Sequence, residues 1–223
     1  MRTIAIGDIH GCYDELIDMI TVLEEDGKYH KDTDRLIFLG DYIDRGKDSN
    51  KVVKYIRELQ RNNKNVIALM GNHEDMCIDY NKDRFANYDW LCNGANATME
   101  SYDDEAQLMS DIMWMKTLPL YYEDEHFIYV HAGIDANKPM TEQSSRNLLW
   151  VRDSFIYSTT KYNKKVIFGH TPSLLVGRND KPYCTHTGNI GIDTGCVFGG
   201  CLTALIIEDD KIEGFYQIEK GQN

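Results

Sequence analysis

Residues 40–46 read GDYIDRG and directly follow a short apolar run. An apolar run of this length predicts a buried strand, and a glycine at its end lets the backbone turn sharply. Two other predicted strands end in the same way. The run at 3–6 leads into GDIHG (7–11), and the run that begins at Val66 leads into GNHE (71–74). Three strands are therefore each followed by a side chain that can bind a metal ion.

The two segments between these strands have the spacing of helices. Apolar residues recur every three or four positions in 14–25, and they do so again after Asn50, which predicts a helix that begins there. Strand–helix–strand units of this length pair their strands in parallel. Because neighbouring strands lie ~4.8 Å apart, Asp8, Asp41 and Asn72 are expected to converge at one edge of the sheet.

The rest of the chain is predicted to be helical in its centre and β-rich towards its end. Residues 73–126 favour helices, including one over 104–118. The strands predicted in the last third, with a hairpin turn at Asp209-Asp210 before the final one, are 127–130, 166–168, 190–192, 202–207 and 214–218. The pattern predicts an α/β fold that forms one domain over residues 1–223.

Two of these later strands also end in histidine, one in HAG (131–133) and one in FGHTP (168–172). Five strand ends thus offer carboxylate, amide and imidazole ligands together: Asp8, His10, Asp41, Asn72, His131 and His170. Mixed oxygen and imidazole ligands suit Mn, Fe or Zn better than Ca. An aspartate has two oxygens and can bridge two ions, as in two-metal hydrolases. His186 lies outside these blocks, and we do not expect it to be a ligand.

Charge and composition exclude several classes of protein. The chain has 24 Lys and Arg against 36 Asp and Glu, a formal net charge of −12, which argues against binding to nucleic acid or to an anionic membrane. No apolar run approaches the ~18 residues of a membrane span. The N-terminus has no apolar region of the kind that signal peptides carry, so a cytoplasmic location is expected.

The six cysteines show no CxxC spacing and are expected to be reduced thiols. A zinc site at Cys196 and Cys201 is the alternative, but the spacing is unusual and no histidine is near in the sequence.

The motif blocks GDIHG, GDYIDRG, GNHE, HAG and GHT resemble those of the metallophosphoesterase superfamily, in particular the PPP-type serine/threonine protein phosphatases. The segments WLCNG (90–94), LLWVRD (148–153) and IDTGCVFGG (192–200) are similar to the subgroup of the bacteriophage lambda phosphatase and its bacterial relatives. The resemblance implies a calcineurin-like fold. In that fold a central β-sandwich is flanked by helices, and the metal site lies at the C-terminal ends of the strands.

The resemblance also implies a role for each motif residue. One metal ion would be held by Asp8, His10 and Asp41, and the second would share Asp41. The other ligands of the second ion would be Asn72, His131 and His170. His73 would be the general acid, oriented by Asp44, and Arg45 and Arg152 would bind phosphate. The binuclear centre is expected to hold two divalent ions, manganese first, with iron or zinc as alternatives.

The activity expected from this resemblance is hydrolysis of phosphoserine and phosphothreonine in proteins or phosphopeptides, with phosphotyrosine as a further substrate. A hydroxide that bridges the two ions would attack the phosphorus directly. The alternative on the same scaffold is a symmetrical diadenosine tetraphosphate hydrolase or a nucleotide-cap pyrophosphatase. Asp44 favours the protein phosphatase, since the nucleotide hydrolases usually lack this aspartate. The intact ligand set argues against a non-catalytic binding module.

Overall fold

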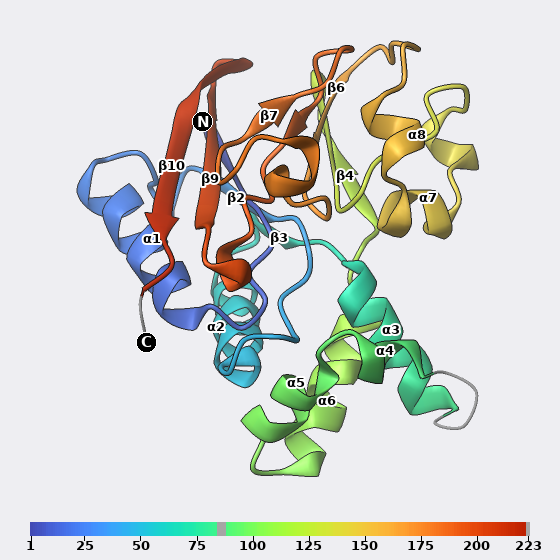
Figure 1. The fold of residues 1–223 in the computed structure, drawn as a ribbon. Helices are drawn as coiled ribbons and strands as arrows, with labels where there is room; N and C mark the ends of the chain where they lie inside the picture. Colours follow the sequence, from blue (N-terminus) through green and yellow to red (C-terminus); the bar gives the residue numbers. More distant parts are fainter. Residues whose placement is uncertain (84–87, 222–223) are drawn as a thin grey trace.

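Two five-stranded sheets pack against each other in the computed structural model, which describes residues 1–83 and 88–221 (Figure 1). The first sheet has the strand order β10-β9-β1-β2-β3, with bounds β1 Arg2–Ile6, β2 Arg35–Phe38, β3 Val66–Ala68, β9 Cys201–Glu208 and β10 Lys211–Glu219. The second has the order β4-β5-β6-β8-β7, with bounds β4 Tyr121–Glu123, β5 Phe127–Val130, β6 Lys165–Phe168, β7 Tyr183–Cys184 and β8 Ile190–Gly191.

The strands that precede the motifs pair with one another in parallel. As predicted, β1, β2 and β3 run parallel, and in the second sheet β5 and β6 do so as well. The C-terminal ends of parallel strands meet at one edge of a sheet. β1 has a second neighbour from the far end of the sequence, because β9 pairs with it antiparallel, with Ile4 opposite Ile206.

Alternating side chains divide the core into layers. Ala5 of β1 and Ile37 of β2 point between the sheets, where they join Tyr129 and Ile167 of the second sheet. Ile4 and Ile6, on either side of Ala5 in β1, point to the outer face of the sheet, since successive side chains of a strand alternate between its two faces. This inner layer fixes how the two sheets sit relative to each other.

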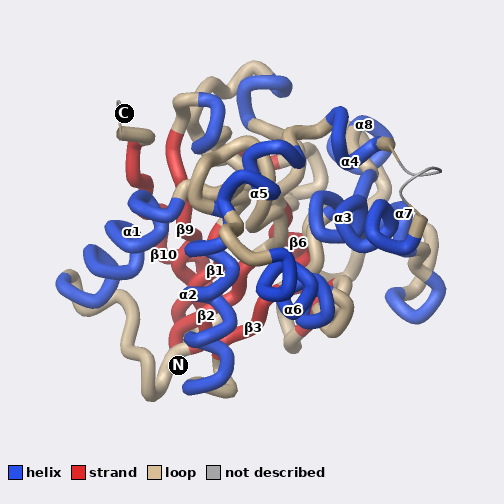
Figure 2. Tube along the Cα trace, turned by 90° about the horizontal axis from the view of Figure 1, so that it is seen from below, coloured by secondary structure: helices blue, strands red, loops and turns tan. Residues whose placement is uncertain are grey.

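Helices cover the outer faces of both sheets (Figures 1 and 2). Helices α1 and α2 pack on the first sheet, and α7 and α8 on the second. Helices α3 to α6 form a group of their own below the sheets in Figure 1. The helix bounds are α1 Tyr13–Glu25, α2 Ser49–Asn62, α3 Asn72–Lys82, α4 Asp89–Cys92, α5 Ala95–Ser101, α6 Glu105–Met115, α7 Ser145–Trp150 and α8 Asp153–Ile156. The second half of the described chain also contains three short 3₁₀ turns, which are η1 Met140–Glu142, η2 Ser173–Val176 and η3 Cys196–Phe198.

The predicted element boundaries differ from the observed ones in a few places. The helix predicted to begin at Asn50 begins at Ser49, with Asp48 as its N-cap. Helix α6 ends at Met115, before the predicted 118. Strands β4 and β7 were not predicted, because each has only two or three residues and acquires its strand character from pairing with a neighbour. Among the residues described, none forms a helix that is long and apolar enough to cross a bilayer.

Candidate active site

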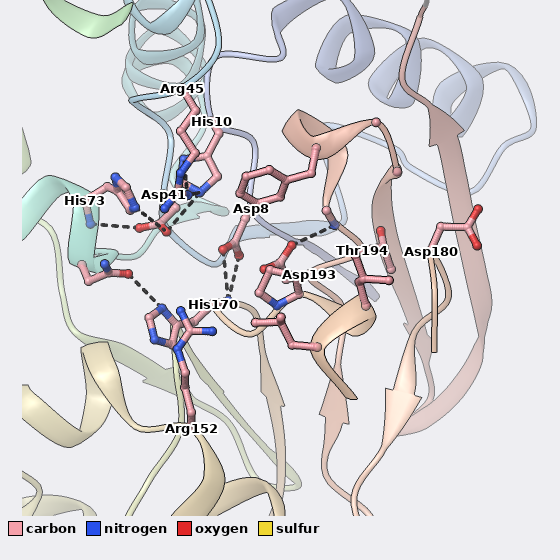
Figure 3. A pocket seen from close by; sticks show the side chains of 18 of the residues that line it. Asp8, His10, Asp41, Arg45, His73, Arg152, His170, Asp180, Asp193 and Thr194 are labelled. Carbon is pink, nitrogen blue, oxygen red and sulfur yellow. Dashed lines mark hydrogen bonds and ion pairs between the residues drawn. The ribbon is translucent and has the colours of Figure 1, made fainter. Parts of the chain in front are cut away.

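The segments that directly follow β1, β2, β3, β5 and β6 carry nine of the ten predicted site residues, and the tenth, Arg152, directly precedes α8. The structure brings the ten together, and Figure 3 shows Asp8, Asp41 and His170 near the middle of the group. A cavity of about 750 Å³ opens beside them. Eight of the ten line it: Asp8, His10, Asp41, Arg45, Asn72, His73, Arg152 and His170. The other two, Asp44 and His131, are buried directly behind this lining.

The backbone of these loops is strained. Five site residues other than glycine have positive φ angles in the left-handed region: His10 at 46°, Asp41 at 53°, Asp44 at 74°, Arg45 at 70° and His170 at 61°. For a residue with a side chain this conformation costs about 1–2 kcal/mol. Such strain persists only where the surroundings impose it, and it is typical of functional sites.

Glu74 is one group that imposes this conformation. Its buried carboxylate accepts hydrogen bonds from the backbone N–H groups of Asp41, Tyr42 and Gly71, each at 2.9 Å. The carboxylate thereby joins the loop after β2 to the loop after β3. Glu74 belongs to the GNHE motif, but the sequence alone indicates no role for it.

A close contact between two glycines joins the loops after β1 and β2. A Cβ atom on Gly46 would lie 2.1 Å from the carbonyl oxygen of His10. Gly11, which faces Gly46, has a φ of +67°. Only glycine fits at both positions, and this explains the glycine at the end of each motif.

His10, Asp41 and His73 form a group that we call the one-sheet cluster, because all three follow strands of the first sheet. The ring of His10 donates from Nδ1 to the carbonyl oxygen of Ile43 at 2.8 Å, and its Nε2 lies 3.4 Å from Asp41 Oδ2. A histidine that donates from one nitrogen to a backbone carbonyl presents the lone pair of the other, as in many metal sites.

Asp41, His131 and His170 form a second group, the cross-sheet cluster, in which both histidines follow strands of the second sheet. His131 donates from Nδ1 to Leu39 O at 2.9 Å, and its Nε2 lies 3.4 Å from Asp41 Oδ1. Asn72 Oδ1 lies 2.8 Å from this Nε2 and 2.9 Å from His170 Nδ1. Asp41 belongs to both clusters.

The donor set fits a divalent metal ion. Burial lowers the pKa of His131. The Nε2 atom of its ring lies 2.8 Å from Asn72 Oδ1 and 3.4 Å from Asp41 Oδ1. Imidazole nitrogen together with amide and carboxylate oxygens is a donor set that suits a divalent transition-metal ion. His170 Nε2 is buried and has no hydrogen-bond partner. A buried polar atom without a partner is costly, whereas the other ring nitrogen, Nδ1, faces the oxygen of Asn72 inside the cluster.

Three carboxylates crowd the same space and add negative charge. Burial, and then the neighbouring Asp193 and Asp41, raise the pKa of Asp8 well above its usual value. The backbone N–H of His170 donates to both oxygens of Asp8, at 3.1 and 3.0 Å. Burial would raise the pKa of Asp41 too, but the surrounding histidines hold it far below the usual value. Bound cations would relieve this repulsion.

Asp193 was missed by sequence reasoning. It lines the cavity, and its carboxylate accepts from the Gly195 N–H at 3.0 Å. A signal for it was present, since it stands at the end of the strand predicted at 190–192, as Asp8 and Asp41 stand near the ends of theirs. It was overlooked because no glycine precedes it.

His73 and Asp44 are joined by a short hydrogen bond of 2.6 Å between Nδ1 and Oδ2. Burial alone would lower the pKa of His73, but Asp41 and then Asp44 outweigh it and raise the pKa. Asp44 also accepts from Trp90 Nε1 at 2.9 and 3.0 Å and from Thr98 Oγ1 at 2.6 Å. The helices of the central segment thus hold the carboxylate that orients His73.

Two arginines flank the cavity. The Arg45 side chain donates to the His10 ring, and Arg152 lies near His170 (Figure 3). Guanidinium groups suit the oxygens of a phosphoryl group because their planar fork can donate two parallel hydrogen bonds.

The alternative zinc site is not supported by the described part of the chain. Cys196 groups with Cys12 and Glu15 and not with Cys201. The Lys220 ammonium donates to both oxygens of Glu15 at 2.9 Å, which places a positive charge where a cation would have to sit. All six cysteines are free thiols in the structure.

Comparisons with known proteins agree with this geometry. Residues 1–200 match the family described as calcineurin-like phosphoesterase. An asymmetrical bis(5'-nucleosyl)-tetraphosphatase of Halalkalibacterium halodurans is 29% identical over 225 residues, which cover 90% of this chain and 87% of that protein. Serine/threonine-protein phosphatase 1 of Salmonella typhimurium is also 29% identical, over 212 residues that cover 91% of this chain and 90% of that protein.

Solved structures show the same fold. A crystal structure provisionally assigned as a diadenosine tetraphosphatase superposes with a TM-score of 0.73 at 21% sequence identity, over 100% of this chain and 95% of that one. At this identity the likeness concerns the fold alone.

Proposed function

The chain belongs to the calcineurin-like phosphoesterase family, and on that premise we propose that it is a metal-dependent hydrolase of dinucleoside tetraphosphates. The phosphoanhydride chain of such a substrate would lie across the proposed metal-binding residues. The oxygen of a water molecule would bond to one phosphorus, the P–O bond to the bridging oxygen would break, and the bridging oxygen would leave with the other phosphate. This is the alternative and not the main expectation from the sequence. The relatives that favour it are tetraphosphatases similar to this chain over about nine-tenths of its length.

The predicted superfamily and fold are confirmed, and so is a phosphoesterase as the class of enzyme. The predicted kinship with the lambda phosphatase subgroup is not shown, since the relatives include tetraphosphatases as well as a serine/threonine-protein phosphatase. Manganese and a cytoplasmic location stay predictions.

We assign the metal ligands as the motifs suggested. Asp8, His10 and Asp41 would hold one divalent ion, and Asp41 would share the second with three further ligands, which are Asn72, His131 and His170. When bound, such ions polarise phosphoryl oxygens and lower the pKa of water so that it becomes a nucleophile near neutral pH. The chain itself keeps the ligand lone pairs aligned, through the hydrogen bonds from His10 to Ile43 and from His131 to Leu39.

The observation that carries the proposal is the size of the cavity together with the two arginines in its lining. Its volume of about 750 Å³ exceeds what a single phosphoryl group needs, and Arg45 and Arg152 both line it. Pockets for small ligands typically measure about 300–1,000 Å³. Two guanidinium groups in one cavity can bind successive phosphates of a chain, which neither a phosphoserine nor a phosphothreonine side chain offers.

A direct comparison of substrates tests the proposal. With Mn²⁺ added, kcat/KM for diadenosine tetraphosphate should exceed that for a phosphoserine peptide by about tenfold or more, equivalent to roughly 1.4 kcal/mol in transition-state binding. Ion-exchange chromatography of the products separates asymmetrical cleavage to ATP and AMP from symmetrical cleavage to two ADP. Faster turnover of the phosphopeptide would reject the proposed function.

One observation favours a second candidate, a phosphomonoesterase for phosphoserine or phosphothreonine. The leaving alkoxide of these esters is strongly basic and needs a proton. The phosphate of a leaving nucleotide is much less basic and has less need of one. His73, held at 2.6 Å by Asp44 with a raised pKa, is suited to supply that proton. The same substrate comparison decides between the two candidates.

A further inference from the structure

Three large apolar side chains lie exposed next to the metal-binding residues. Phe198, Leu174 and Leu175 are 62%, 66% and 66% exposed, and all three line the same cavity as Asp8 and His10. We call these three residues the apolar wall. Single exposed apolar residues are common, but a group of them around one cavity marks a surface that binds a ligand.

The wall is held in a defined position. Phe198 belongs to η3, where its backbone N–H donates to Gly195 O at 2.9 Å. Gly195 and Gly199, at φ 71° and 88°, make the tight turns on either side. The two leucines belong to η2, whose Ser173 N–H donates to the backbone oxygen of Asp193 at 2.9 Å. Both halves of the wall are thus tied to the segment around Asp193.

Arg45 links the wall to the metal-binding residues. Its guanidinium lies 5.3 Å from the centre of the Phe198 ring, and the same side chain donates to His10. A positive charge therefore stands between the one-sheet cluster and the aromatic face. The matching ligand is anionic at one end and flat and apolar at the other.

We propose that the apolar wall binds one nucleobase of the substrate, stacked on Phe198 and covered by Leu174 and Leu175. This inference rests on the proposed function and deepens it. Asn179 and Asp180 line the same cavity, and Figure 3 shows Asp180 on the far side of Thr194 from the metal-binding residues. They can bond to polar groups at the edge of a base. A nucleobase combines an apolar face with such an edge.

Equilibrium binding of ligands that cannot be hydrolysed tests the wall. The probes are a methylene-bridged analogue of diadenosine tetraphosphate and, without a base, methylenediphosphonate. Stacking of a base on an aromatic side chain contributes about 1–3 kcal/mol to binding, whichever base is present. Phe198→Ala should therefore weaken binding of the nucleotide analogue about tenfold. Binding of methylenediphosphonate should weaken much less. Leu175→Ser should act in the same direction and more weakly.

Phe215→Ala is the matched control. Phe215 is also an exposed phenylalanine, at 42%, but it lies on β10 and not in the lining of the cavity. This variant should bind both probes like the wild type. An unchanged dissociation constant for the nucleotide analogue in both Phe198→Ala and Leu175→Ser would overturn the inference.

The proposed function is tested by hydrolysis, and the apolar wall is tested by equilibrium binding, so the two can fail independently. If the wild type does not hydrolyse diadenosine tetraphosphate, that function fails, while binding of the analogue still tests the wall. If the wall variants lower turnover of a phosphopeptide and leave binding of the analogue unchanged, the wall serves a peptide and our inference is wrong.

Discussion

The two ligand clusters share Asp41 but are assembled in different ways. The one-sheet cluster takes His10, Asp41 and His73 from segments that follow three parallel strands of a single sheet. The cross-sheet cluster adds His131 and His170 from the other sheet. Loops of one sheet are aligned by strand pairing, whereas the second cluster also depends on the packing between the sheets. The geometry of the one-sheet cluster therefore depends on strand pairing alone, and that of the cross-sheet cluster depends on strand pairing and on sheet packing.

The largest effect should follow from changing the residue that both clusters share. Asp41→Asn removes a negative charge from each, so both ions should be lost and kcat should fall at least about 10⁴-fold, because charge stabilisation and the nucleophile disappear together. Metal content after dialysis and turnover with added Mn²⁺ measure this. Retention of two ions with wild-type turnover would show that Asp41 does not bridge.

A smaller and selective effect is expected for His73, which lies in the one-sheet cluster but is proposed as an acid. His73→Asn should lower kcat about 10²-fold for a phosphoserine peptide and much less for para-nitrophenyl phosphate, whose leaving group needs no proton. The metal content should stay at the wild-type level. His186→Asn, at an exposed histidine outside the cavity lining, is the control. Loss of metal in His73→Asn would make it a ligand instead.

The central helices should act on the same step through Asp44. Trp90→Phe removes a hydrogen bond to this carboxylate and keeps an aromatic ring. A positioning contact of this kind is worth about tenfold, so kcat for the phosphoserine peptide should fall by that factor and para-nitrophenyl phosphate should be spared. Trp114→Phe, which loses a bond to Gln60 in another part of the molecule, is the matched control. Equal losses on both substrates would contradict the positioning role.

The smallest effect should separate the clusters by their dependence on sheet packing. Ile167→Val removes one methylene from the core between the sheets, and Ile56→Val removes one from the core under α2. Each should cost about 1 kcal/mol of stability. Only Ile167→Val should weaken binding of one of the two ions, by about threefold, as titration calorimetry with Mn²⁺ would record. Identical metal affinities in both variants would mean that the cross-sheet cluster does not sense the packing.

Sequence patterns predicted that the proposed ligands would come together; their role as ligands stays a prediction. Asp8, Asp41 and Asn72 each follow a glycine at the end of a predicted strand, and parallel strands have to bring such ends together. This rule uses only the residues at the end of each strand, so it also indicated His131 and His170. Applying it requires no knowledge of how the two sheets pack.

The contacts that support the ligands were not predictable in this way. Trp90 and Thr98 reach Asp44 across 46 and 54 residues of sequence. The four-residue turn η2, which exposes Leu174 and Leu175, is too short to show any periodicity. Such contacts are set by the tertiary arrangement of short helices, which no local sequence pattern reveals.

The pairing of β1 with β9 has a consequence for synthesis of the chain. β1 ends at Ile6, and its second neighbour begins only at Cys201. At translation rates of ~5–20 residues per second, roughly 10–40 s separate the two strands. During this time the nascent chain exposes one unpaired edge of its central strand, and such edges can pair with other chains. We expect the protein to be most prone to aggregation before its last hairpin has left the ribosome.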